Sequence, residues 1–305
     1  EPVPPEEMGL PEREGEVPGV PIRLRALPGE EANAAFAAGG AAALLDGTIF
    51  TLPLADTGPL ARGTIRLDPA LGLFGMIVTN EQGFLAEVEN REALSMAVDR
   101  AALLEQFSVS GWQPSAQIVP GGLPGNPNVR GERWPGMSLD QRRSQARARV
   151  TAWSRATGQN ARVRLWLPDG PGSDRLMNAL SLDFATIGVE LRRVPFSQGA
   201  DLVMIDRLAR YPGARWFLNQ FNCTLLPGPC SPDADELVTE SLKAGGAEEA
   251  DNLLAEAEGA LLAREAYIPL GAPVRWSLVR SGLEGFSENS WSRHPLYALA
   301  GVEPW

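Results

Sequence analysis

One short segment carries the side chains best suited to bind a polar ligand. Residues 206–218 hold three arginines and two aromatic residues with polar edges: Arg207, Arg210, Arg215, Tyr211 and Trp216. A guanidinium donates paired hydrogen bonds to a carboxylate, and these rings offer flat apolar area for a ligand body. The residue types therefore favour binding over catalysis in this segment.

The same segment has a structural alternative. Trp216, Phe217 and Leu218 could begin a core helix while the arginines face water. We expect Phe217 and Leu218 in the core, and both interpretations stay open for Tyr211 and Trp216. The segment follows an apolar run at 202–205 that predicts a buried strand, and ligands of α/β folds bind beyond strand ends.

Catalytic chemistry has few candidates in this sequence. The only histidine, His294, lies in a polar tail, and no G-x-S-x-G motif is present, so a solvated or structural histidine is expected. Glu248 and Glu249 fall on a predicted helix and are interpreted as solvated. Cys223 and Cys230 supply too few ligands for zinc. We expect no enzyme activity, no cofactor and no metal, although acid–base hydrolysis by carboxylates is not excluded.

The composition narrows the class of protein. A chain of 305 residues is long enough for two lobes, and its 44% apolar and 21% charged residues are typical of a soluble globular protein. The net charge of −11 argues against nucleic acid as a partner. No apolar run approaches the ~20 residues that span a bilayer. The only lysine, Lys243, does not lie in a phosphate-loop pattern.

The elements that must position these residues alternate as in an α/β fold. The periodicity predicts strands at 22–27, 163–167, 189–194, 202–205, 267–270 and 274–279, with helices between most of them. Ser138 and Gln141 form a capping-box pattern, and Ser173 and Ser231 are expected to cap the helices that follow them.

Residues 89–104 predict two short helices in series. Asn90 can cap the first helix, and Asp99 interrupts the apolar stripe where a second cap would restart the backbone. The buried stripe has helical spacing and comprises Leu94, Ala97, Val98, Ala101 and Leu104.

This stretch resembles a family signature. Asn90-Arg91-Glu92-Ala93-Leu94-Ser95 followed by Ala97-Val98-Asp99-Arg100 is similar to the VRxALsxAiDR motif of family 5 extracellular solute-binding proteins, the oligopeptide- and dipeptide-binding components of ABC importers. Other segments follow the order of that family: Gly111-Trp112-Gln113-Pro114, Val119-Pro120-Gly121-Gly122, Ile187-Gly188-Val189-Glu190-Leu191, Ala200-Asp201-Leu202, Tyr211-Pro212 and Phe217-Leu218.

The resemblance implies an α/β periplasmic-binding-protein-like fold (type II, cluster C-like) with two lobes, one complete and the other partial. We expect residues 22–80 with 275–305 to form the partial lobe I and residues 81–274 the C-terminal lobe. Residues 1–21, rich in glutamate and proline, are expected to be an extended acidic linker. Because the sequence resembles only the C-terminal part of the family, a further N-terminal region or a second chain is an expected partner.

The same resemblance implies a function. We expect periplasmic capture of a peptide-like or other small polar solute for an ABC permease. The alternative is a protein-interaction or sensor module that keeps the fold without transport. The expected ligand residues are Asn80 at the lobe crossover, Trp112 near the cleft, Arg210, Tyr211, Arg215 and Trp216. For Trp112, packing within its own loop is the alternative.

Two details qualify the resemblance. In an oxidising compartment Cys223 and Cys230 are expected to form a local disulfide, and two free thiols in a reducing cytosol are the alternative. Family members tend to carry Asp-Pro where this chain has Gly213-Ala214. The part of the ligand site formed by residues 206–218 is therefore expected to favour a carboxylate or a neutral polar group over an ammonium.

Overall fold

The computed structural model describes residues 21–55, 64–107, 109, 112–125, 133–225 and 228–301. The predicted acidic linker at 1–21 lies outside these residues except for its last position.

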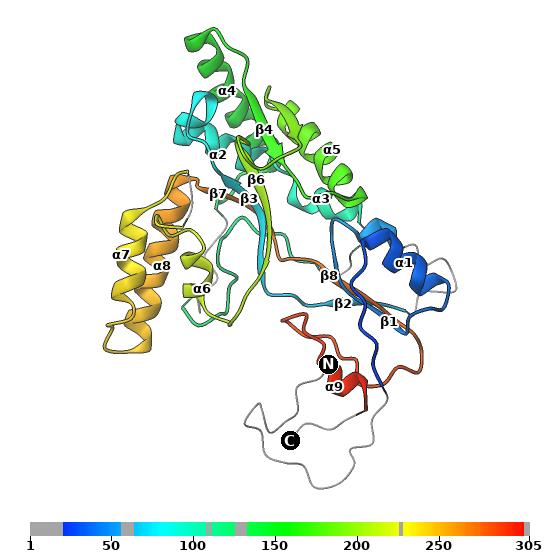
Figure 1. Cartoon of the computed structure of the whole chain (residues 1–305). Helices are drawn as coiled ribbons and strands as arrows, with labels where there is room; N and C mark the ends of the chain where they lie inside the picture. The colour runs from blue at the N-terminus through cyan, green and yellow to red at the C-terminus, as the bar shows by residue number, and fades with distance from the viewer. Residues whose placement is uncertain are drawn as a thin grey trace.

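A five-stranded mixed sheet forms the centre of the molecule, with strand order β5-β4-β6-β3-β7 (Figure 1). Its strands are β3 (Gly72–Val78), β4 (Arg162–Trp166), β5 (Glu190–Val194), β6 (Leu202–Leu208) and β7 (Tyr267–Gly271). Strand β4 runs parallel to β5 and β6, whereas β3 runs antiparallel to β6 and β7. Every residue of β3 is buried, as expected for an apolar strand that is covered on both faces.

Helices cover both faces of this sheet (Figure 1). One core joins Phe74 and Met76 to α2 (Val88–Ala97), α4 (Leu139–Thr157) and α5 (Pro171–Ala185). A second core joins Leu73 and Ile77 to α6 (Ala214–Asn219), α7 (Pro232–Glu240) and α8 (Ala247–Arg264). Neighbouring residues of β3 thus point into opposite cores, which follows from the two-residue period of a strand.

A smaller antiparallel sheet of order β1-β8-β2 lies beside the first (Figure 1). It contains β1 (Ala43–Thr48), β2 (Ile65–Asp68) and β8 (Arg275–Val279). Trp276 on β8 is buried and belongs to the same core as Phe74, so apolar packing is continuous between the two sheets. The remaining short elements are α1 (Gly29–Ala37), α3 (Arg100–Glu105), α9 (Leu296–Leu299) and the 3₁₀ turns η2 (Leu52–Leu54) and η3 (Gly83–Ala86).

Most predicted elements are present, with three corrections. Residues 22–27 form no strand. Asn90 does not cap a helix: α2 begins at Val88, and the buried Asn90 side chain donates to the carbonyl of Phe84. Ser173 lies inside α5, where its hydroxyl donates to Pro168 O.

The division into lobes stays a prediction. Strand β3, which ends just before the predicted boundary at residue 80, pairs with β6 and β7 of the segment that follows.

Other capping predictions are confirmed. Ser138 and Gln141 form a reciprocal capping box at the start of α4, and the Ser231 side chain accepts from Ala234 N at the start of α7. Asp99 Oδ1 accepts from Ala102 N at the start of α3. These residues satisfy orphan N–H groups of their helices, which is why short sequence signals located three helix starts.

The signature helices are held by a buried arginine that bonds to backbone carbonyls. Arg91 Nη1 donates to Leu85 O at 2.7 Å and to Ala86 O at 3.1 Å. Its Nη2 donates at 2.9 Å to Arg264 O, the last residue of α8. The guanidinium thus satisfies a carbonyl that the end of α8 would otherwise leave unpaired.

A second buried arginine ties α3 to the sheet. Arg100 Nε donates to Pro269 O in β7 at 2.8 Å, and Nη2 donates to Ser95 Oγ at 2.9 Å. Burial, with repulsion from Arg133 and Arg142, lowers the pKa of Arg100 to about 9. The guanidinium therefore stays protonated at neutral pH and needs these acceptors.

The two cysteines are bonded in the predicted pairing. Cys223 and Cys230 form a disulfide with their Cα atoms 5.2 Å apart. The bridge closes the segment between α6 and α7, and Cys230 O accepts from Arg264 Nε at 3.1 Å. It therefore fixes this connection beside the end of α8.

Replacing Arg91 by methionine tests the role of the signature helices. The change leaves the carbonyls of Leu85, Ala86 and Arg264 without these donors, so we expect a loss of about 3 kcal/mol or more in the free energy of unfolding. Urea denaturation measures it. Arg155→Met, at an exposed position of α4, is the matched control and should change stability by less than about 0.5 kcal/mol. A loss below about 1 kcal/mol for Arg91→Met would contradict this role.

The disulfide gives a separate prediction. Replacing both Cys223 and Cys230 by serine should lower the free energy of unfolding by about 2–3 kcal/mol, because the unfolded chain gains conformational entropy. Protein unfolded without reductant should show no thiol that reacts with a maleimide. Labelling of both cysteines under those conditions would rule the bridge out.

Candidate functional site

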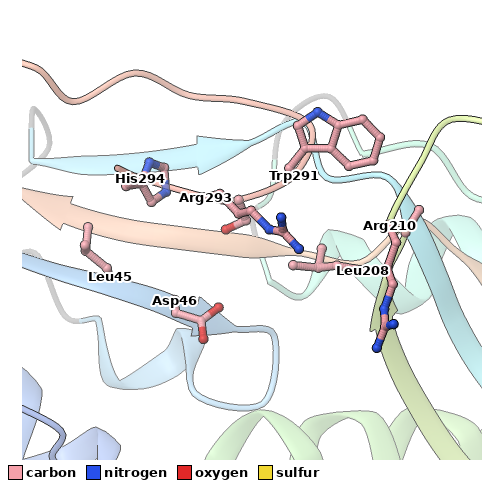
Figure 2. A pocket seen from close by; sticks show the side chains of 9 residues that line it. Leu45, Asp46, Leu208, Arg210, Trp291, Arg293 and His294 are labelled. Carbon is pink, nitrogen blue, oxygen red and sulfur yellow. The ribbon is translucent and has the colours of Figure 1, made fainter. Parts of the chain in front are cut away.

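A pocket lies where β6 ends, between the small sheet and the C-terminal segment. Its volume is about 430 Å³. The lining residues come from β1, from the end of β6 and from the segment after β8, and are Leu45, Asp46, Leu208, Ala209, Arg210, Trp291, Ser292, Arg293 and His294 (Figure 2). We refer to this cavity as the strand-end pocket. It lies at the strand end that the sequence predicted for a ligand site.

Backbone pairing brings these three segments together. Ala209 N donates to Leu71 O at 2.7 Å, and Leu71 N donates to Ser290 O at 2.9 Å. The residues after β6 and the C-terminal segment are thereby anchored to the start of β3. The walls of the strand-end pocket therefore depend on contacts between residues far apart in the sequence.

Asp68 holds the C-terminal wall in place. This buried carboxylate accepts from Asn289 N at 2.8 Å and from Ser292 Oγ at 2.8 Å, and His294 Nε2 lies 3.1 Å from Asp68 Oδ2. The His294 ring also stacks on Phe286 with centroids 4.4 Å apart. A catalytic triad would need histidine between serine and aspartate, whereas here both groups contact the aspartate. His294 is a structural residue, as the sequence analysis expected.

The pocket lining carries both signs of charge. Arg210 and Arg293 are exposed, and in the described part of the chain neither guanidinium makes an ion pair or a hydrogen bond. Asp46 is the only carboxylate among the described lining residues, and its side chain is 78% exposed. Charged groups that line one cavity can bind complementary groups of a ligand.

A buried ion pair lies behind Asp46 and joins the two sheets. Arg275 Nη1 on β8 lies 2.7 Å from Asp206 Oδ1 on β6, and both side chains are almost fully buried. Arg275 Nε is 3.9 Å from Asp46 Oδ1. Burial, together with the negative charge of Asp46, raises the pKa of Asp206 to about 6, against the opposing attraction of Arg275.

The structure separates the predicted residues of segment 206–218. Arg210 lines the strand-end pocket, and Tyr211 follows it with 44% of its surface exposed. Trp216 is buried and packs edge-on against Phe217, with ring centroids 4.9 Å apart. Arg215 donates to Ser241 Oγ at 3.0 Å at the end of α7, away from the lining. Of the four predicted ligand residues in this segment, only Arg210 and Tyr211 are thus available to a ligand.

The other two predicted residues lie elsewhere. Trp112 Nε1 donates to Ala272 O at 2.6 Å, and the ring packs edge-on against Phe74, so it holds its own loop against β7. Asn80 Nδ2 donates to Asp201 Oδ1 at 2.8 Å. Asn80 and Asp201 flank the other end of the β3–β6 pair, roughly 20 Å from the strand-end pocket along a seven-residue strand.

Sequence reasoning missed Asp46 and Arg293. Asp46 comes from β1, a strand that the sequence did not predict, and Arg293 comes from a loop with no periodicity. An Asp46-Gly47 pair inside an apolar run is a signal for a bulge that would have drawn attention to Asp46. No short-range signal places Arg293 beside β6.

Two absences apply to the described residues alone. None of the helices there has the length and apolar content to cross a bilayer. Within the same ranges, no group of three or more histidine, cysteine, aspartate or glutamate side chains is arranged to hold a metal ion.

Titration of Asp206 tests the electrostatics beneath the pocket. Its side-chain carboxyl ¹³C resonance should titrate near pH 6, and Asp46→Asn should lower that pKa by removing a repulsive charge. Because the folded-state pKa is raised, the associated stability is complete below about pH 4 and is lost as the pH rises through 6. Asp140→Asn, at an exposed position of α4, is the control. Titration at the ordinary value of about 4 would contradict this assignment.

Comparison with known proteins identifies the fold. No family model matches the sequence, and no curated protein matches it. Among solved structures, Haemophilus influenzae OppA in complex with RPPGFSPFR shares 18% identity with a TM-score of 0.76, covering 88% of this chain and 55% of that one. The Escherichia coli murein tripeptide binding protein MppA shares 16% identity at TM-score 0.71, covering 86% and 54%.

A third match binds a different kind of ligand. NikA from Brucella suis in complex with Fe(III)-EDTA shares 13% identity at TM-score 0.68, covering 91% of this chain and 60% of that one. All three are binding proteins, and the chain spans a little over half of their lengths. The chain therefore has the mixed α/β fold of the corresponding part of periplasmic oligopeptide-binding proteins.

Proposed function

We propose that this chain binds a small, peptide-like solute that carries a carboxylate, as part of a solute-binding protein that serves an ABC permease. The observation that carries the proposal is the pair of unpaired guanidinium groups, Arg210 and Arg293, on one pocket. The fold supports a binding role, since the matched structures are binding proteins.

The two arginines favour an anionic ligand group. A guanidinium offers planar, paired donors that fit a carboxylate, and such a charge-assisted contact contributes about 1.5–3 kcal/mol. Tyr211, on the turn that carries Arg210, can pack its ring against the body of the ligand. The missing acid at Gly213-Ala214 agrees with this preference.

The location of the protein is part of the proposal. MppA is a periplasmic murein tripeptide binding protein, and the Cys223–Cys230 disulfide fits an oxidising compartment. These two observations support a periplasmic location, where delivery to a permease would require no catalytic step by this chain.

Calorimetric titration with trialanine and with its C-terminal amide tests the proposal. Amidation removes the carboxylate and should weaken binding roughly ten- to hundredfold. Arg210→Ala should weaken binding of the free acid by a similar factor and leave the amide nearly unaffected. Arg155→Ala, at an exposed site of α4, is the matched control and should bind as the unchanged protein does. If the amide binds as tightly as the free acid, the carboxylate is not the anchor.

A further inference from the structure

We propose that a second pocket of this protein binds a small aliphatic amine in its ammonium form. The pocket lies beside α2, where α8 ends and β7 begins (Figure 1), and its volume is about 310 Å³. Three glutamates and one arginine line it together with apolar side chains: Glu89, Glu92, Glu265, Arg133, Val88 and Leu262. We refer to this cavity as the helix-end pocket.

The helix-end pocket and the strand-end pocket lie at opposite ends of β3. Tyr267, at the start of β7, pairs with Ile77 near the end of β3. Ala209 of the strand-end pocket instead donates to Leu71 O, just before β3 begins. A strand of seven residues spans roughly 20 Å. The second site therefore adds to the proposed function and does not depend on it.

Glu265 occupies a backbone position that rarely holds a glutamate. It ends α8 with a φ of 50° and a ψ of 37°, which is the left-handed conformation. Glycine is the usual residue at such a helix end, because a Cβ atom makes this conformation less favourable. Residues other than glycine that are held in this way often occur at functional sites. The position therefore draws attention to what the Glu265 side chain does.

The Glu265 carboxylate is buried with one oxygen left over. Its side chain is 5% exposed, and Oε1 accepts from the Arg133 guanidinium. The second oxygen, Oε2, is buried, and it has no hydrogen-bond partner among the described residues. A buried acceptor without a donor is rare because its lost hydration is costly in free energy. An N–H donor that enters the helix-end pocket would remove this cost.

The charges around the helix-end pocket favour one positive group. Arg133 pairs with Glu265, and Arg149 Nη1 of α4 lies 2.6 Å from Glu92 Oε2. Glu89 is exposed, and its carboxylate forms neither a hydrogen bond nor an ion pair with any residue that the structure describes. The pocket lining thus combines one carboxylate without a paired cation and one buried oxygen without a donor.

An alkylammonium fits this combination. It carries a single positive charge and three N–H donors, so it can pair with Glu89 and donate to Glu265 Oε2. Its alkyl chain can pack against Val88 and Leu262. A metal ion fits poorly, because the Arg133 guanidinium lies in the lining and no described group of acidic, histidine or cysteine side chains is arranged to hold one.

Titration of isotopically labelled protein with n-butylamine, followed through amide chemical shifts at pH 7, tests the inference. An aliphatic amine is almost fully protonated at that pH. The amide resonances of Glu89 and Glu265 should shift together along one saturating curve, while those of Arg210 and Arg293 in the strand-end pocket stay in place. n-Butyltrimethylammonium carries the same charge and alkyl chain but has no N–H donor, so it should bind at least about tenfold more weakly.

A matched pair of variants connects the binding to a named side chain. Glu89→Gln removes the unpaired charge at an exposed position, so the variant should fold and bind n-butylamine at least about tenfold more weakly. Glu87→Gln, two residues earlier and also exposed, lies outside the pocket lining and should bind as the unchanged protein does. Thermal unfolding of both variants verifies that they are folded.

Three results would overturn the assignment. Equal binding of n-butylamine and n-butyltrimethylammonium would mean that the acidic surface attracts any cation. Unchanged binding by Glu89→Gln would exclude its carboxylate as the partner of the ammonium. Absence of a saturating shift at Glu89 and Glu265 would exclude the pocket itself. None of these results bears on the carboxylate-binding proposal, which concerns the strand-end pocket and is tested with trialanine and its amide.

Discussion

The structure depends on two buried guanidinium groups that bond to backbone carbonyls. Arg91 satisfies the carbonyl of Arg264 at the end of α8, and Arg100 satisfies that of Pro269 in β7. A buried arginine stays charged at neutral pH, and burying that charge without hydrogen-bond acceptors is costly in free energy. These bonds therefore fix helices α2 and α3 against the segment that leaves α8 and enters β7.

The position of the strand-end pocket follows from that constraint. Strand β7 continues through Ala272, which accepts from Trp112, into β8, where Arg275 pairs with Asp206 of β6. This buried ion pair sets the small sheet against the end of β6. Asp46 and Arg210 line one cavity because the two sheets meet at this point. The signature motif thus does not contact the strand-end pocket; it fixes the packing of the helices and strands that hold this pocket in place.

The sequence predicted the features that depend on interactions between residues close together in the chain. The capping box at Ser138 and the cap at Ser231 located helix starts, and the signature helices led to the fold that the solved structures share. The sequence alone could not predict which aromatic side chains face a ligand. Trp216, for example, is buried because it packs in the core formed by α6, α7 and α8. Sequence reasoning also missed Asp46, since a carboxylate from one sheet and an arginine from another meet only through long-range packing. Asn90 is a second example. Its side chain could have capped a helix, but in the structure it is buried against η3 and donates to the carbonyl of Phe84.

A solute that binds in the strand-end pocket should change the amide chemical shifts of the residues that line it. Addition of trialanine to isotopically labelled protein should shift the amide resonances of Asp46, Arg210 and Arg293 together, with one binding curve. The resonances around Asn80, at the other end of the β3–β6 pair, should stay in place. Shifts confined to the surroundings of Asn80, or no shifts at saturating trialanine, would contradict the account.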